Sequence, residues 1–229
     1  MQRRSLMAVL AASHWAALTA QAQTAPSPGE VAAYRDLHAA AHRGDLAALR
    51  QALAGGVAVD GRDGHGRTPL HVATFARQRE AIQALAAAGA KLGLLENDHY
   101  DAVTIASVAD DEPTLRLLLA LGASAKLITS RYDGTALIAA AHLGHDGVVR
   151  QLIAAGAPLD HVNNLHWTAA IEAVVLGDGG PRHQATLKAL IDAKANLQLA
   201  DRSGRTPLAL ARERGYTAMT RMLEGAGAR

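Results

Sequence analysis

The chain has 229 residues, of which 49% are hydrophobic and only 3% aromatic, a composition that excludes intrinsic disorder and favours short packed helices over bulky β-sandwiches. The absence of cysteine excludes a disulfide framework, so the fold must be stabilised by packing alone. The formal net charge is only +2, whereas nucleic-acid-binding proteins are typically strongly basic. From its composition, the sequence predicts an all-α protein.

The first 22 residues have the organisation of a secretory signal peptide. Residues 1–4 are short and basic, residues 6–18 are mostly apolar, and Ala20-Gln21-Ala22 supplies the small residues that signal peptidase requires before a cut. We predict cleavage near Ala22 and a periplasmic or secreted protein. The apolar stretch is shorter than the roughly twenty residues that span a membrane, so no stable membrane insertion is expected after cleavage.

The segment that follows the predicted cleavage point differs in composition from the rest of the chain. Residues 23–29 are rich in Gln, Thr, Pro and Ser, which predicts a flexible lead-in before a folded domain over residues 30–229. Removal of Arg3 and Arg4 with the signal peptide leaves 21 basic residues against 21 acidic ones. That balance argues further against a nucleic-acid partner.

An internal repeat emerges when the chain is aligned with itself at a lag of 33 residues. Thr68-Pro69-Leu70-His71 then lies on residues 101–104, and with small shifts the register continues through Thr135 and Thr168 to Thr206-Pro207-Leu208. A period between 20 and 50 residues indicates an array of structural units. The predicted units lie near residues 34–60, 61–93, 94–126, 127–160, 161–198 and 199–229.

Within each unit, an apolar helix is followed by a position at which a residue with positive φ would end that helix cheaply. Arg77 and Asp110 occupy this position in units two and three, so we expect those two turns to be built differently. The other units place glycine there, at Gly44, Gly144, Gly177 and Gly215.

These residues resemble the ankyrin repeat. Its hallmark Thr-Pro-Leu-His is complete at residues 68–71, nearly complete at 206–208 and degraded elsewhere, and the resemblance extends from about residue 35 to residue 229. In such a unit Thr caps the first helix, Pro fits its first turn and Leu packs inward, which gives His71 a structural role. The resemblance implies a solenoid of about six helix-turn-helix units with short β-hairpin fingers, whose first helices line a concave face.

Aromatic and polar residues gather at the predicted finger tips, just before the Thr position of units three to five. In a chain with so few aromatics this concentration suits a protein interface, because aromatic rings bury much area with little loss of rotamer entropy. The alternative is that Tyr100 and Trp167 pack against neighbouring fingers. The candidate partner-binding residues are His99, Tyr100, Tyr132, Asp133, His166 and Trp167.

One irregularity interrupts the repeat between Gly177 and His183, where the five residues 178–182 are inserted. Asp178, Arg182 and His183 could form a small polar site, since inserted loops often carry function. The alternative is a neutral insertion, because surface loops on repeat proteins lengthen at little thermodynamic cost.

Metal and catalytic chemistry find little support in the sequence. The pairs His38/His42 and His142/His145 have spacings that share a helix face, but no acidic or cysteine ligand is placed to complete a tetrahedral metal site. The sequence contains no nucleophile elbow, phosphate loop or paired-carboxylate motif. We therefore predict a protein that is not an enzyme and that uses no metal or cofactor.

The sequence favours a protein-binding adaptor or protective partner in the bacterial periplasm, acting through its concave face and hairpin fingers on another protein whose identity the fold does not reveal. A second hypothesis is a small-ligand or metal-binding protein that uses the inserted loop 178–182 with His183. A third is a purely structural spacer.

Overall fold

The computed structural model describes residues 23–229, so the predicted signal peptide lies outside the described residues. Thirteen helices and two short strands make up this part of the chain. Their bounds are α1 (Pro28–Ala33), α2 (Asp36–Arg43), α3 (Leu46–Ala54), α4 (Pro69–Phe75), α5 (Arg79–Ala87), α6 (Ala102–Val108), α7 (Glu112–Ala120), β1 (Ile128–Thr129), β2 (Gly134–Thr135), α8 (Ala136–His142), α9 (Asp146–Ala154), α10 (Ala169–Val175), α11 (Pro181–Asp192), α12 (Pro207–Glu213) and α13 (Thr217–Gly225).

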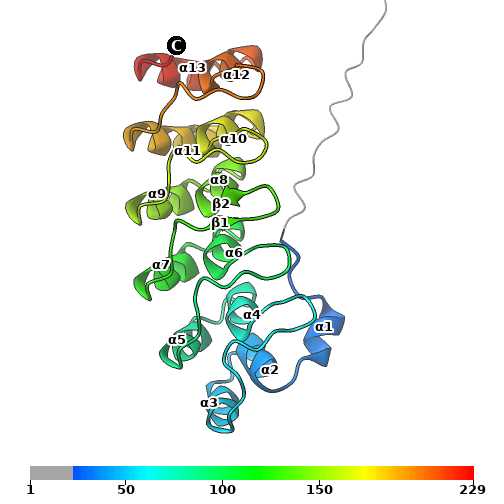
Figure 1. Ribbon diagram of the computed structural model, residues 1–229. Coiled ribbons are helices and arrows are strands. Elements are labelled where there is room, and N and C mark those ends of the chain that lie inside the picture. The colour runs from blue at the N-terminus through cyan, green and yellow to red at the C-terminus, as the bar shows by residue number, and fades with distance from the viewer. Residues whose placement is uncertain (1–22) are drawn as a thin grey trace, which may run out of the picture.

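Helices α2 to α13 form six pairs that stack into one column, with the finger loops projecting on the side of the first helices (Figure 1). The first helices α2, α4, α6, α8, α10 and α12 pack against one another along the column, and the second helices do the same. Each unit therefore contacts mainly its neighbours, as in other repeat proteins. The predicted all-α solenoid of six helix-turn-helix units is confirmed.

The repeated Thr position begins the first helices. The Thr68 hydroxyl accepts the backbone N–H of His71, and Thr135 and Thr168 cap α8 and α10 in the same way. In unit three the capping residue is Asp101, whose carboxylate accepts the N–H of Thr104 at 2.8 Å. Short polar side chains of this kind accept hydrogen bonds from the free N–H groups at a helix start. The first helix can therefore begin at the same position whether the residue there is threonine or aspartate.

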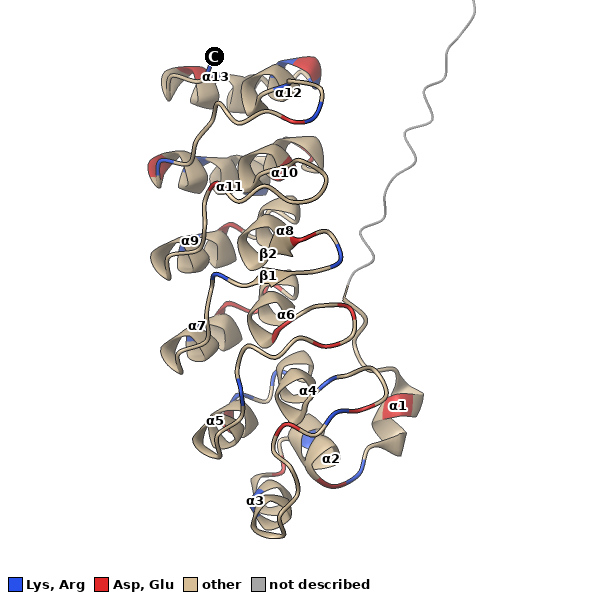
Figure 2. Ribbon diagram, in the orientation of Figure 1, with Lys and Arg blue, Asp and Glu red and all other residues tan. Residues whose placement is uncertain are grey.

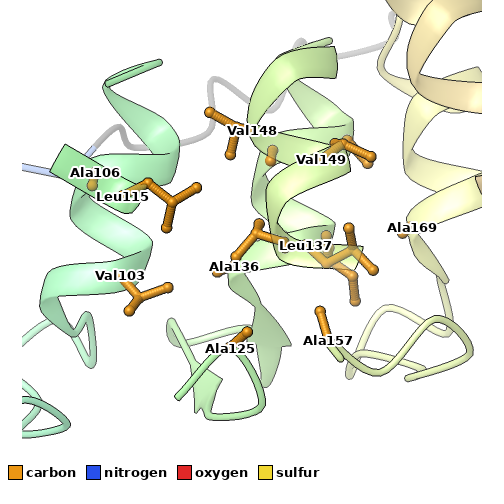
Figure 3. Close-up of a cluster of buried hydrophobic side chains, with 14 of the residues drawn as sticks. Val103, Ala106, Leu115, Ala125, Ala136, Leu137, Val148, Val149, Ala157 and Ala169 are labelled. Carbon is orange, nitrogen blue, oxygen red and sulfur yellow. The ribbon is translucent and has the colours of Figure 1, made fainter. Parts of the chain in front are cut away.

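A continuous hydrophobic core runs through all six units. Alanines allow the first helices to approach closely, and aliphatic side chains such as Leu115, Leu137 and Val149 fill the space between the two helix layers (Figure 3). All three are fully buried. No unit covers its own apolar face, so each depends on the next for its stability.

The turns between paired helices differ from the prediction. Arg77 (φ 56°) and Asp110 (φ 53°) adopt the left-handed conformation that Gly144 (φ 67°) also adopts, so the expectation that their turns are built differently is wrong. The reason is a shared hydrogen bond, from the N–H after the turn residue to a carbonyl five residues back, as in Gln78 to Ala73. This bond fixes the turn whichever side chain occupies it.

Unit five departs from the others at the insertion. The positive φ lies at Gly179 instead of Gly177, and Pro181 begins α11, which has 12 residues where α9 has nine. The insertion therefore does more than enlarge a loop, because its last two residues extend a helix. Proline at the first helical position favours this extension, since it has no N–H to leave unpaired.

The boundary of the lead-in also differs from the prediction. Helix α1 begins at Pro28, inside the segment predicted as flexible, because Ser27 and Glu30 form a reciprocal capping box. The fingers contain less sheet than the resemblance implies. Within residues 23–229 the only ladder is the two-residue pairing of β1 with β2. None of the helices in this range has the length and apolarity to cross a membrane.

Candidate functional site

A common side-chain turn builds the fingers. In each, one side-chain oxygen accepts the N–H groups of the residues two and four positions ahead, as Asn163 does from Leu165 and Trp167, both at 3.0 Å. Such turns hold the loop with little or no β-ladder and fix the residue at their last position. The oxygens come from Asp63, Glu96, Ser130, Asn163 and Asp201.

The outer and middle fingers carry different residues at that last position. Arg67 and Arg205 occupy it in units two and six, and each pairs with the aspartate of its own turn. The three middle fingers have Tyr100, Gly134 and Trp167 there. At this position the outer fingers therefore have an arginine paired with an aspartate, whereas the middle fingers have two aromatic residues and a glycine.

A cavity of about 160 Å³ lies between these middle fingers and the first helices of units three to five. The rings of Tyr100, Tyr132 and Trp167 line it on the finger side. The first helices and the residues that directly follow them contribute aliphatic side chains, and the main ones are Val108 of α6, Ile138 of α8, and Leu143 and Leu176 just after α8 and α10. Such a concave, largely apolar site with a few polar groups is typical of ligand recognition.

A buried carboxylate belongs to the same cavity. Glu172 of α10 is only 4% exposed, its Oε1 accepts the Asn163 amide at 3.0 Å, and its Oε2 lies 3.3 Å from Nδ1 of His142. Burying a carboxylate costs free energy unless polar partners compensate it. At the matching position the other five first helices have Ala39, Val72, Ile105, Ala139 and Leu210, so the acid is peculiar to unit five.

The start of the described chain reaches this cavity from outside the repeats. The extended segment before α1 runs past the finger loops (Figure 1), and Gln23 lines the cavity. Its amide nitrogen is buried and has no hydrogen-bond partner among the described residues. A segment in extended conformation therefore fits against the middle fingers.

The structure separates the candidate finger residues into two groups. Tyr100, Tyr132 and Trp167 are half-buried and line the cavity together, and burial raises the pKa of Tyr100. The other three are exposed at the loop tips, where their backbones are left-handed: His99, Asp133 and His166. Glu172 and Gln23, which sequence reasoning missed, complete the site.

The inserted loop makes its polar contacts within the array. His183 Nδ1 lies 2.8 Å from Asp178, and its Nε2 lies 2.9 Å from the carbonyl oxygen of His142. Arg182 pairs with Asp110 of unit three at 2.7 Å. Arg182 and His183 thus link unit five to units three and four at the end opposite the fingers, whereas Asp178 contacts His183 within its own unit. Nothing in these contacts favours a small ligand there.

The paired histidines point to separate partners. His38 Nε2 lies 3.0 Å from the Arg67 carbonyl, and His145 Nδ1 lies 2.9 Å from the Ser107 carbonyl, whereas His142 faces Glu172. Between residues 23 and 229 no three histidine or acidic side chains are grouped as metal ligands.

Comparison with known proteins identifies the family. A family model for ankyrin repeats in three copies matches residues 34–96 and 103–194. The chain belongs to the ankyrin-repeat family. This ankyrin-repeat protein is 34% identical over 190 residues to the ankyrin repeat protein YahD of Escherichia coli K12, a match that covers 82% of this chain and 94% of YahD.

Solved structures agree with that assignment. An ankyrin repeat domain from Acinetobacter baumannii superimposes with a TM-score of 0.79 at 42% identity, covering 84% of this chain and 98% of the other. The ankyrin repeat domain of Bcl-3, a member of the IκB protein family, gives a TM-score of 0.77 at 25% identity, covering 86% and 87%. Ankyrin-repeat domains generally mediate protein–protein interaction and are generally not enzymes.

The surface of this ankyrin-repeat protein carries both signs of charge. Acidic and basic residues are interspersed along the array in the view of Figure 2, and neither sign dominates. The distinctive feature of the surface is therefore the aromatic cavity and its buried acid.

Proposed function

We propose that this ankyrin-repeat protein is an adaptor or protective partner in the bacterial periplasm, which holds a segment of another protein between the fingers of units three to five. The observation that carries the proposal is the cavity lined by Tyr100, Tyr132 and Trp167. Aromatic side chains fixed by a rigid scaffold supply much of the binding energy at protein interfaces. The array fixes these rings, because each finger is a hydrogen-bonded turn on a buried helix.

Replacing Tyr100 and Trp167 together by alanine is expected to reduce partner capture at least about tenfold, because truncating each anchor residue costs on the order of 1–2 kcal/mol. The measurement is affinity capture from a periplasmic extract, with the retained proteins quantified by mass spectrometry. Helical content by circular dichroism should match that of the unaltered chain.

The matched control replaces His99 and His166, which stand on the same two fingers but are exposed at their tips. This control variant should retain the partner. Equal capture by the aromatic double variant and the unaltered chain would show that the cavity is not the binding surface.

Export makes a separate prediction. When the gene is expressed with its own N-terminus, the protein recovered from the periplasm should begin at Gln23, because Ala20-Gln21-Ala22 precedes the predicted cut. Intact-mass measurement after cell fractionation determines the N-terminus. Recovery of the full 229-residue chain from the cytoplasmic fraction would remove the periplasmic part of the proposal.

A further inference from the structure

We propose that the cavity between the middle fingers selects a basic side chain, lysine or arginine, carried on an extended segment of the partner. This inference rests on the proposed function, because it names the chemistry that the partner presents to the same surface. It is carried by three features of the cavity: its single carboxylate, its aromatic walls and the segment that already lies in it.

Among the described residues the cavity holds one carboxylate, that of Glu172, and no lysine or arginine, and His142, 3.3 Å from Glu172, is the basic side chain beside it. This differs from the outer fingers, where Arg67 and Arg205 lie against aspartates. At the last position of the finger turn, the middle fingers thus lack the cation that the outer fingers possess.

The hydrogen bonding of Glu172 leaves room for another donor. An ionised carboxylate offers about four acceptor positions, and Glu172 uses one for the Asn163 amide while His142 approaches its second oxygen at 3.3 Å. Asn163 fits this task well, because its oxygen builds the finger turn while its nitrogen donates to the acid. A lysine ammonium or an arginine guanidinium would supply the remaining donors and the opposite charge.

The walls of the cavity suit the rest of such a side chain. Tyr100, Tyr132 and Trp167 present aromatic rings, which attract a cation placed over their faces when water is excluded. The aliphatic side chains of Val108, Ile138, Leu143 and Leu176 match the methylene stem of lysine or arginine, which prefers apolar surroundings up to its charged end. A neutral apolar side chain would satisfy the walls but leave the acid uncompensated.

Gln23, the first described residue, shows that a chain segment without helix or strand can reach the cavity. Gln23 belongs to a segment without helix or strand, and it places a buried N–H donor in the cavity. A basic side chain on a partner segment would bring a donor to the same place and add the charge that glutamine lacks. The partner segment would therefore displace Gln23.

Two peptides that differ in one side chain test this inference on the full chain: acetyl-Ala-Ala-Lys-Ala-Ala-amide and its norleucine counterpart, which has the same stem without the charge. Binding is followed by the NMR shift of the Trp167 indole N–H, assigned with a Trp167→Phe variant. The lysine peptide should bind about tenfold more tightly than the norleucine peptide. This comparison does not depend on the folding of any variant.

Substitution of the acid supplies the second arm. Glu172→Gln should remove the preference for lysine, whereas Glu112→Gln, which alters a glutamate outside the cavity that also accepts a side-chain amide, should retain it. Equal affinity for both peptides, or a preference that survives Glu172→Gln, would overturn selection of a cation while leaving the cavity as a peptide site. If neither peptide shifted the Trp167 signal, selection of a basic side chain would also be overturned. The proposed function would then be decided separately, by whether the unaltered chain captures a partner from the periplasmic extract and the aromatic double variant does not.

Discussion

Lowering the pH from 7 to 4 is expected to reduce the free energy of unfolding by about 3 kcal/mol through His71 alone. This ring is 1% exposed, with one nitrogen against Thr68 and the other 2.9 Å from the Leu94 carbonyl. Burial lowers the pKa of His71 to about 4 from an ordinary value of 6.5. Between those values the unfolded chain binds a proton that the folded chain does not, so the stability is complete above pH 6.5 and is lost progressively toward pH 4.

Urea unfolding at half-unit pH steps would measure this loss. His71→Gln should flatten the dependence between pH 6.5 and 4, although it also lowers stability at pH 7 by removing the hydrogen bonds of the ring. His99→Gln, which alters an exposed histidine at a finger tip, is the matched control and should leave the dependence unchanged. A His71→Gln variant with the original pH dependence would show that other groups cause the loss.

The repeat made most of the fold predictable from the sequence. Thr68-Pro69-Leu70-His71 fixes the start of one first helix, and the lag of 33 residues transfers that start to the other units. Substitution of Asp101 for threonine did not break the register, because both side chains cap a helix by the same hydrogen bond. The structural role predicted for His71 agrees with its burial and its two contacts.

Two sequence-based predictions are wrong, namely the turns at Arg77 and Asp110 and the start of α1. In both places the same residues are compatible with more than one local structure. Arg77 was expected to change its turn because arginine disfavours positive φ, yet the hydrogen bonds of the surrounding helices impose that conformation. The start of α1 was missed because the composition of residues 23–29 indicates a loop, whereas Ser27 and Glu30 contain the capping-box signal.

The candidate site was only partly predictable. Position in the repeat singles out the three aromatic residues, because each lies one to three residues before the helix-capping position of its unit, but it does not show that they share one cavity. Glu172 carries a weaker signal: an acid at a position where the other units place aliphatic residues. Its partner His142 lies one unit away, and that contact depends on how the units stack.

Replacing Arg67 by methionine is expected to lower the free energy of unfolding by about 3 kcal/mol, because it leaves Asp63, whose side chain is only 10% exposed, without its cation. Arg67 is 2% exposed, its Nε donates to Asp63 at 2.7 Å, and its Nη2 contacts Glu30 of α1. Tyr34 also donates to Asp63, at 2.9 Å. Burial raises the pKa of Asp63, but hydrogen bonds from Arg67 outweigh it and hold that pKa below its ordinary value. Asp63 would lose its cation, and Glu30 would keep only His65, which lies 3.0 Å away.

Guanidinium unfolding measures the free energy of unfolding of Arg67→Met and of Arg205→Met. The comparison shows how much of the loss depends on burial, because both arginines are paired but only Arg67 is fully buried. Arg205 occupies the same position in the last finger and also pairs with its turn aspartate, but its side chain is 34% exposed and α1 does not cover it, so its loss should cost less than the loss of Arg67. Converting Glu30 and Asp63 to their amides in the Arg67→Met chain should restore part of the stability, since neither side chain then carries an unpaired charge. Equal losses for the two arginine variants would contradict this account, and they would mean that docking of α1 on the second finger contributes little to the stability of the array.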